Sequence, residues 1–148
     1  MTDQFLLNLA EYVGANEKIQ VTKYLDEIRP FLRRYSECYR LWRLSDPKDV
    51  ESFLSKNTYL STTKDLDVIP YLAESGDHEE DDLVTLHSGI GFSPISILKR
   101  GLSTLTKEVD YVERVIFDNE YQKEIFLLKV DPSFEYWGVW NGYEIDLL

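Results

Sequence analysis

The chain has 148 residues, a length that suits one folded domain with a sizeable core. Hydrophobic residues make up 43% and aromatic residues 14%, which excludes an intrinsically disordered protein. The formal net charge is −11 and the pI is near 4.6, so the surface repels phosphate backbones. A protein partner with a basic surface is therefore expected in preference to nucleic acid.

The first half of the chain alternates between helical and strand patterns. Apolar residues recur at helical spacing after Asp3, a capping residue, and an aromatic-rich segment predicts the first strand. Asp46 followed by Pro47 marks the start of a further helix. The predicted elements are helix 3–13, helix 21–34 kinked or divided at Pro30, strand 38–44, helix 46–56 and strand 58–62.

The second half is richer in strand patterns. Ser93 and Pro94 predict a helix start that Gly101 ends, and Asn141 with Gly142 predicts a hairpin. The predicted elements are helix 66–73, acidic loop 76–82, strand 83–87, helix 95–99, and strands 111–117, 124–130, 134–140 and 143–147. No repeat or linker divides the chain, so we expect one α+β domain over 1–148, with 1–36 as a helical lead-in to a twisted antiparallel sheet.

Disulfides, metal sites and membrane segments are not expected. Cys38 is the single cysteine, and it has no zinc-ligand spacing with His78 or His87. The acidic segment 76–82 lacks the ligand spacing and turn glycine of a calcium loop, which favours a solvated loop. The first residues carry no secretion signal and no apolar stretch approaches transmembrane length, so we expect a soluble, cytoplasmic protein without a membrane partner.

Three fragments carry the side chains best suited to chemistry: Trp42-Arg43-Leu44, Tyr59-Leu60-Ser61-Thr62-Thr63, and Gln122-Lys123-Glu124 before an apolar run. An arginine fork matches a phosphate, and a hydroxyl such as that of Ser61 can orient a sugar hydroxyl or a carboxylate. A carboxylate at the start of an apolar strand, such as Glu124, can stabilise an oxocarbenium-like transition state. Gln122 lies two residues before Glu124, so both should face one cleft.

The three fragments follow each other in a fixed order: an arginine, a Ser-Thr-Ser-like strand end and a Gln-x-Glu. This order resembles the pattern of the Arg-Ser-Glu branch of the mono-ADP-ribosyltransferases, and the resemblance covers roughly residues 38–148. The resemblance implies a split antiparallel β-sheet core of ADP-ribosyltransferase type, with NAD as substrate and no metal. It implies NAD-binding roles for Arg43, Ser61, Thr62 and Glu124. Catalytic roles are implied for Glu124, Gln122 and Ser61: Glu124 accepts the ribose hydroxyl, and Gln122 orients the acceptor side chain.

The chain departs from the family pattern near its arginine. Leu44 stands where a glycine commonly follows, and Arg40 is an alternative to Arg43 on the opposite face of the same strand. Arg43 is preferred because its surroundings are more similar to the strand exit of the family. Thr63 replaces the second serine and keeps a hydroxyl.

The resemblance also bears on the target. Members with Gln-x-Glu modify asparagine or guanine, and the loop before this motif, here 110–121, helps to recognise the target through residues such as Phe117 and Tyr121. The family includes compact bacteriophage transferases that modify host proteins in the host cytoplasm, and this length suits such a role. The alternative is a non-catalytic acidic protein that uses the same fold to bind or inhibit a basic partner.

Overall fold

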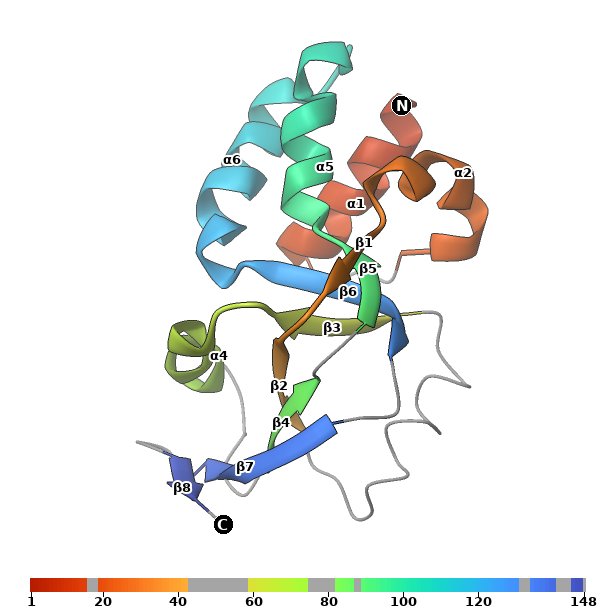
Figure 1. The fold of residues 1–148 in the computed structure, drawn as a ribbon. Coiled ribbons are helices and arrows are strands. Elements are labelled where there is room, and N and C mark those ends of the chain that lie inside the picture. Colours follow the sequence, from red (N-terminus) through yellow and green to blue (C-terminus); the bar gives the residue numbers. More distant parts are fainter. Residues whose placement is uncertain are drawn as a thin grey trace.

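The structure is a computed structural model that describes residues 1–15, 19–42, 59–74, 82–86, 89–130, 134–140 and 145–147. The predicted helix 46–56, the hairpin turn at Asn141-Gly142 and residues 76–81 of the acidic segment lie outside the described residues. So do Arg43, Leu44 and both histidines. The described chain is α+β, as predicted, with helices stacked on an antiparallel sheet (Figure 1).

Helices lie both at the N-terminus and in the middle of the chain. The helices are α1 (Asp3–Ala15), α2 (Leu25–Ile28), α4 (Ile69–Glu74), α5 (Pro94–Gly101) and α6 (Val109–Asn119), with 3-10 turns η1 (Val21–Tyr24), η2 (Arg29–Phe31), η3 (Leu66–Val68), η4 (Leu102–Thr104) and η5 (Glu120–Gln122). The Ser93 hydroxyl accepts a hydrogen bond from the Ser96 amide at 3.2 Å, which confirms the predicted cap of α5.

The described strands form one sheet in the order β1-β5-β6-β3-β2-β4-β7-β8, and every pair is antiparallel. Their bounds are β1 (Arg33–Tyr35), β2 (Cys38–Trp42), β3 (Leu60–Thr63), β4 (Asp82–Leu86), β5 (Gly89–Phe92), β6 (Glu124–Val130), β7 (Phe134–Trp140) and β8 (Ile145–Leu147). In the described ranges β2 meets β3 at one partner pair, Tyr39 and Thr63. The sheet therefore consists of a first half-sheet (β1-β5-β6-β3) and a second half-sheet (β2-β4-β7-β8), joined at a narrow point.

The core has two parts, one on each face of the first half-sheet. Helices α1, α5 and α6 cover one face, and the second half-sheet lies on the other side (Figure 1). Phe92 and Phe126 are fully buried within the cluster of helical residues. Because side chains alternate along a strand, Ile125 and Leu127 face the opposite way, where both are buried. Glu124 shares its face of β6 with Phe126 and so lies on the helical side.

The predicted strand 111–117 is wrong, and so is the predicted loop 110–121. This segment forms α6, followed directly by η5. The segment is rich in β-branched and aromatic residues, which favours a strand locally. Val112, Val115 and Ile116 nevertheless recur at i, i+3 and i+4, and all three are buried against the helical core. Tertiary packing of this face therefore decides the conformation.

Two further expectations at the edge of the first half-sheet are corrected. The predicted helix 21–34 ends at Phe31, and Arg33 and Arg34 belong to β1. Strand β5 was not predicted, because its glycines weaken the local strand pattern. The two strands pair with each other, from Arg33 opposite Gly91 to Tyr35 opposite Gly89. Each thus acquires its conformation from a partner distant in sequence.

No helix in the described ranges is both long enough and apolar enough to cross a membrane. Over the same residues, no group of three or more His, Cys, Asp or Glu side chains is placed to hold a metal ion.

Candidate functional site

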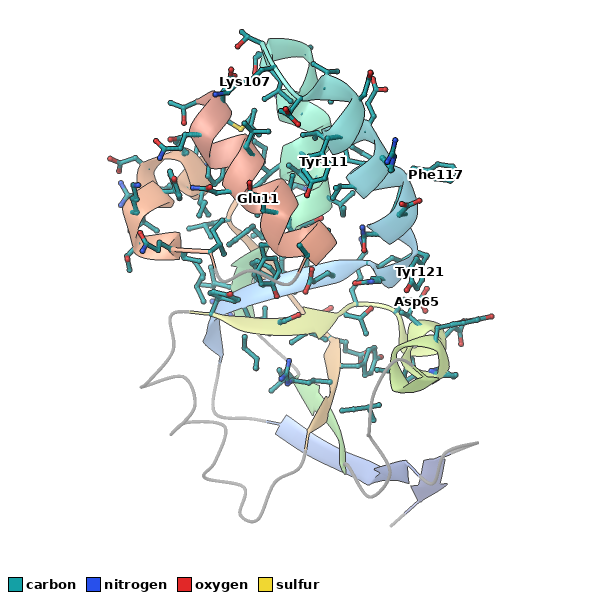
Figure 2. The ribbon with its side chains drawn as sticks, turned by 180° about the vertical axis from the view of Figure 1, so that it is seen from behind. Glu11, Asp65, Lys107, Tyr111, Phe117 and Tyr121 are labelled. Atoms are coloured by element: carbon teal, nitrogen blue, oxygen red, sulfur yellow. The ribbon has the colours of Figure 1, made fainter. Side chains whose placement is uncertain are left out.

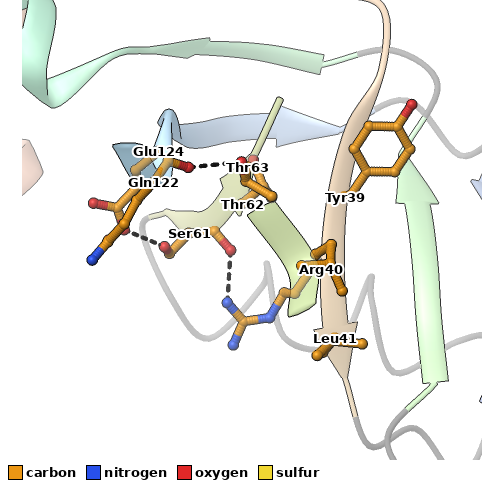
Figure 3. Close-up of a pocket in the computed structure, with 9 residues that line it drawn as sticks. Tyr39, Arg40, Leu41, Ser61, Thr62, Thr63, Gln122 and Glu124 are labelled. Carbon is orange, nitrogen blue, oxygen red and sulfur yellow. Dashed lines mark hydrogen bonds between the residues drawn. The ribbon is translucent and has the colours of Figure 1, made fainter. Parts of the chain in front are cut away.

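A pocket of about 150 Å³ lies where the two half-sheets join (Figure 3). Strands β2 and β3 line it together with the first turn of α4 and the entrance to β6. The lining residues are Tyr39, Arg40, Leu41, Ser61, Thr62, Thr63, Ile69, Gln122 and Glu124. Ser61, Thr62, Gln122 and Glu124, four of the predicted site residues, are therefore brought together in one concave site.

Glu124 is held in this pocket by the pairing of β3 with β6. Thr63 lies opposite Glu124 and Ser61 lies opposite Phe126, so Ser61 and Glu124 share a face of the sheet. The Ser61 hydroxyl donates a hydrogen bond to Oε2 of Glu124 (Figure 3). A second hydroxyl, that of Tyr12 in α1, donates to the same oxygen at 3.4 Å.

Two opposing effects act on the Glu124 carboxylate. Burial raises its pKa above the ordinary value, because the charged form loses contact with water. The hydrogen bonds from Ser61 and Tyr12 and the positive charge of Arg40 lower the pKa in part. A partly buried carboxylate with such opposing influences is typical of a functional site.

Arg40 brings a positive charge from β2 into the pocket. Its Nη1 donates a hydrogen bond to the main-chain carbonyl of Ser61 at 2.6 Å, which also ties β2 to β3 at their narrow junction (Figure 3). Arg40 is the arginine that was weighed as the alternative to Arg43. Since Arg43 lies outside the described residues, Arg40 is the arginine that the structure places in the pocket.

The segment that enters β6 is fixed by contacts with the end of β3. The Thr63 hydroxyl donates to the carbonyl of Gln122 at 2.7 Å. Lys123 adopts a left-handed conformation with φ of 45°, and its Nζ pairs with Asp65 at 3.0 Å. These contacts connect the entrance of β6 to the end of β3 and present Gln122 and Glu124 at one end of the pocket.

Gln122 and Thr62 differ in how much of their polar surface is available. The Gln122 amide donates to Asn119 and to the Tyr121 hydroxyl, both at the long distance of 3.4 Å, and the side chain is half-buried. The Thr62 hydroxyl is buried and donates to the Ile125 carbonyl at 2.9 Å. Gln122 can therefore exchange partners for a ligand, whereas Thr62 serves mainly to hold β3 on β6.

Two large aromatic side chains lie exposed close to Gln122 in sequence. Phe117 at the end of α6 is 84% exposed and Tyr121 in η5 is 52% exposed. Figure 2 shows both of them on the outer side of the helical layer, directed away from the core. Both side chains are therefore accessible on the surface next to Gln122.

Tyr12 is the pocket neighbour that sequence reasoning missed. It precedes Glu124 by 112 residues and lies in a helix whose pattern indicates only a buried face. Its polar contact depends on how α1 packs against the sheet, so no local pattern could have revealed it. Comparison of the chain with protein-family models, with curated proteins and with solved structures finds no match.

Proposed function

We propose that the chain is a mono-ADP-ribosyltransferase that cleaves NAD and transfers ADP-ribose to a side chain of a target protein. The observation that carries the proposal is the hydrogen bond from Ser61 to Glu124, in one pocket with Gln122 and Arg40. These residues come from β2, β3 and the entrance to β6, as the Arg-Ser-Glu pattern requires. Two half-sheets with the pocket at their junction also support a split sheet of ADP-ribosyltransferase type.

The proposed reaction assigns a role to each pocket residue. The bond between the ribose C1′ and nicotinamide breaks with both electrons leaving on nicotinamide, and positive charge develops on the ribose. Glu124 accepts a hydrogen bond from the ribose 2′-hydroxyl and stabilises this charge, and Ser61 orients Glu124. The acceptor atom of the target then bonds to C1′ and loses its proton to solvent, while Gln122 orients the acceptor group.

The volume of the pocket limits how much of an NAD molecule the described residues can enclose. Sites for drug-sized ligands enclose about 300–1,000 Å³. The observed 150 Å³ is smaller. The described residues would therefore hold the ribose that bears nicotinamide, next to Glu124, and Arg40 would lie at the side of the pyrophosphate. The donor set fits a sugar and an anion, because it combines hydroxyl, amide, carboxylate and guanidinium groups.

Target recognition is assigned to the surface next to Gln122. The helix–turn segment of α6 and η5 stands where a recognition loop was expected, and it carries the exposed Phe117 and Tyr121. With a net charge of −11, the chain favours a basic protein surface as partner, such as a host protein for a bacteriophage enzyme. The amide of Gln122 favours an amide acceptor over a guanidinium.

One experiment tests the function directly. Incubation of the protein with labelled NAD and a cell lysate should place label on protein, and a Glu124→Gln sample should not. NAD binding without any NAD cleavage or protein labelling would overturn the transferase proposal. Absence of both NAD binding and labelling would favour the non-catalytic acidic binding protein.

Arg40→Lys should raise the KM for NAD by about 10-fold to 100-fold, because lysine keeps the charge and loses the fork that fits a phosphate. The effect on kcat should be smaller. Steady-state kinetics would measure both constants. Arg33→Lys, at an exposed position of β1 away from the pocket, is the matched control and should leave KM unchanged. If KM for NAD rises in Arg43→Lys but not in Arg40→Lys, Arg43 and not Arg40 is the arginine that contacts the pyrophosphate.

Gln122→Ala should abolish transfer to the target, while NAD hydrolysis to free ADP-ribose persists. The substitution removes the group that orients the acceptor and leaves Glu124 and Ser61 in place. Labelled NAD with product separation measures hydrolysis, and mass spectrometry identifies the modified side chains. Gln4→Ala, at an exposed position of α1, is the control. ADP-ribose found only on arginines would contradict the proposed acceptor, and loss of both activities would show that Gln122 serves NAD.

A further inference from the structure

Glu124 receives hydrogen bonds from two hydroxyl groups that come from different layers of the fold. Ser61 reaches Oε2 from β3, and Tyr12 reaches the same oxygen from α1 at 3.4 Å. In the part of the chain that the structure describes, Oε1 of Glu124 accepts no hydrogen bond. Two donors on one oxygen restrict the rotation of the carboxylate and leave the other oxygen for a ligand.

The Tyr12 ring is itself held in place by aromatic contacts. Its centroid lies 4.6 Å from that of Phe126 at an interplanar angle of 89°, and 5.8 Å from that of Tyr59 at 85°. Phe126 and Tyr59 stack on each other at 4.8 Å. These edge-to-face contacts aim the Tyr12 hydroxyl and do not depend on it, because the ring alone makes them.

We propose that Tyr12 is a positioning residue for the Glu124 carboxylate, through which helix α1 becomes part of the site. The catalytic effect of Tyr12 rests on the transferase function proposed above, whereas the contact itself does not. Tyr12 and Ser61 both donate to Oε2. Oε1 then accepts the hydrogen bond from the ribose hydroxyl. Residues 1–15 are then required for the geometry of the site as well as for the core.

The groups around Glu124 give the contact an electrostatic consequence. Glu124 is faced by Tyr12 from α1, Ser61 from β3, Arg40 from β2, and Tyr59 just before β3. A hydroxyl that donates to a carboxylate favours its charged form and opposes the effect of burial on the pKa of Glu124. Burial in the first place, and then the charge of Glu124, raise the pKa of Tyr12, so Tyr12 remains a neutral donor at physiological pH.

Tyr12→Phe tests the contact, because it removes one oxygen and keeps the ring. The pKa of Glu124, measured by NMR titration of its side-chain carboxyl carbon, should rise in the variant. The acid limb of the kcat/KM profile should move to higher pH by the same amount, with kcat lowered about tenfold and KM for NAD little changed. Tyr24→Phe is the matched control: it removes a buried hydroxyl that accepts a hydrogen bond from Asn8, away from Glu124, and should leave the pKa of Glu124 unchanged.

A second measurement needs no variant. In the wild-type protein the Cζ signal of Tyr12 should follow the titration of Glu124, because the hydrogen bond changes when the carboxylate is protonated. An unchanged pKa of Glu124 in folded Tyr12→Phe, or a Cζ signal of Tyr12 insensitive to that titration, would overturn the proposal. These NMR readouts do not require turnover. If the NMR titrations show the expected effects but the wild-type protein does not cleave NAD, the proposed transferase function is wrong and the contact between Tyr12 and Glu124 still stands.

Discussion

Glu124→Gln is expected to lower the rate of NAD cleavage by a factor of about 10²–10³ or more, because it removes negative charge where positive charge develops in the transition state. Glutamine has almost the same shape and can still accept the hydrogen bond from Ser61, so most of the affinity for NAD should remain. Release of nicotinamide measures the rate, and NAD titration measures the affinity. Wild-type turnover in the variant would show that Glu124 is not the catalytic carboxylate.

Glu124→Gln should also be more stable than the wild type, so its loss of activity would not come from unfolding. Burial raises the pKa of Glu124 in the folded protein above the unfolded value of about 4.3. Between the two pKa values the folded protein binds more protons than the unfolded chain, so wild-type stability falls as pH rises through this window. Glutamine does not titrate. The variant should therefore have a higher free energy of unfolding than the wild type at neutral pH and nearly the same one at low pH.

Gly91→Ala should have the largest effect on stability. An added Cβ at Gly91 would lie 1.9 Å from the main-chain oxygen of Phe126 in the paired strand β6. Neither strand can yield without breaking the pairing next to the register shift between Ile90 and Gly91. The free energy of unfolding should fall by at least about 3 kcal/mol in denaturant titration. Since β6 also carries Glu124, displacement of this strand should reduce activity as well.

Gly101→Ala is the control for a glycine whose close neighbour can move. The added Cβ would meet the side-chain end of Leu6, at 2.5 Å from Cδ2, where a change of rotamer relieves the contact. Alanine also favours the helical conformation of α5, which offsets part of the cost. The loss should therefore stay near about 1 kcal/mol. Equal losses in the two variants would show that the main-chain contact of Gly91 is not decisive.

Local patterns predicted the elements whose sequence and tertiary environment agree. Strands β6 and β7 have the predicted bounds, and α1 and α5 begin near their predicted capping residues. The convergence of Ser61 with Glu124 was predicted from their places in the ordered Arg-Ser-Glu pattern, and no local pattern indicated it. The pairing of β3 with β6 brings the two side chains to one face of the sheet.

The remainder depended on contacts between distant parts of the chain. The residues of α6 favour a strand locally, and the burial of Val112, Val115 and Ile116 against other helices makes them helical. The position of the arginine depends on which face of β2 meets the pocket, and the sequence determines only that Arg40 and Arg43 face opposite ways. The contact of Tyr12 with Glu124 arises only when α1 packs on the sheet, because it joins residues that are 112 positions apart and leaves no periodic trace in the sequence.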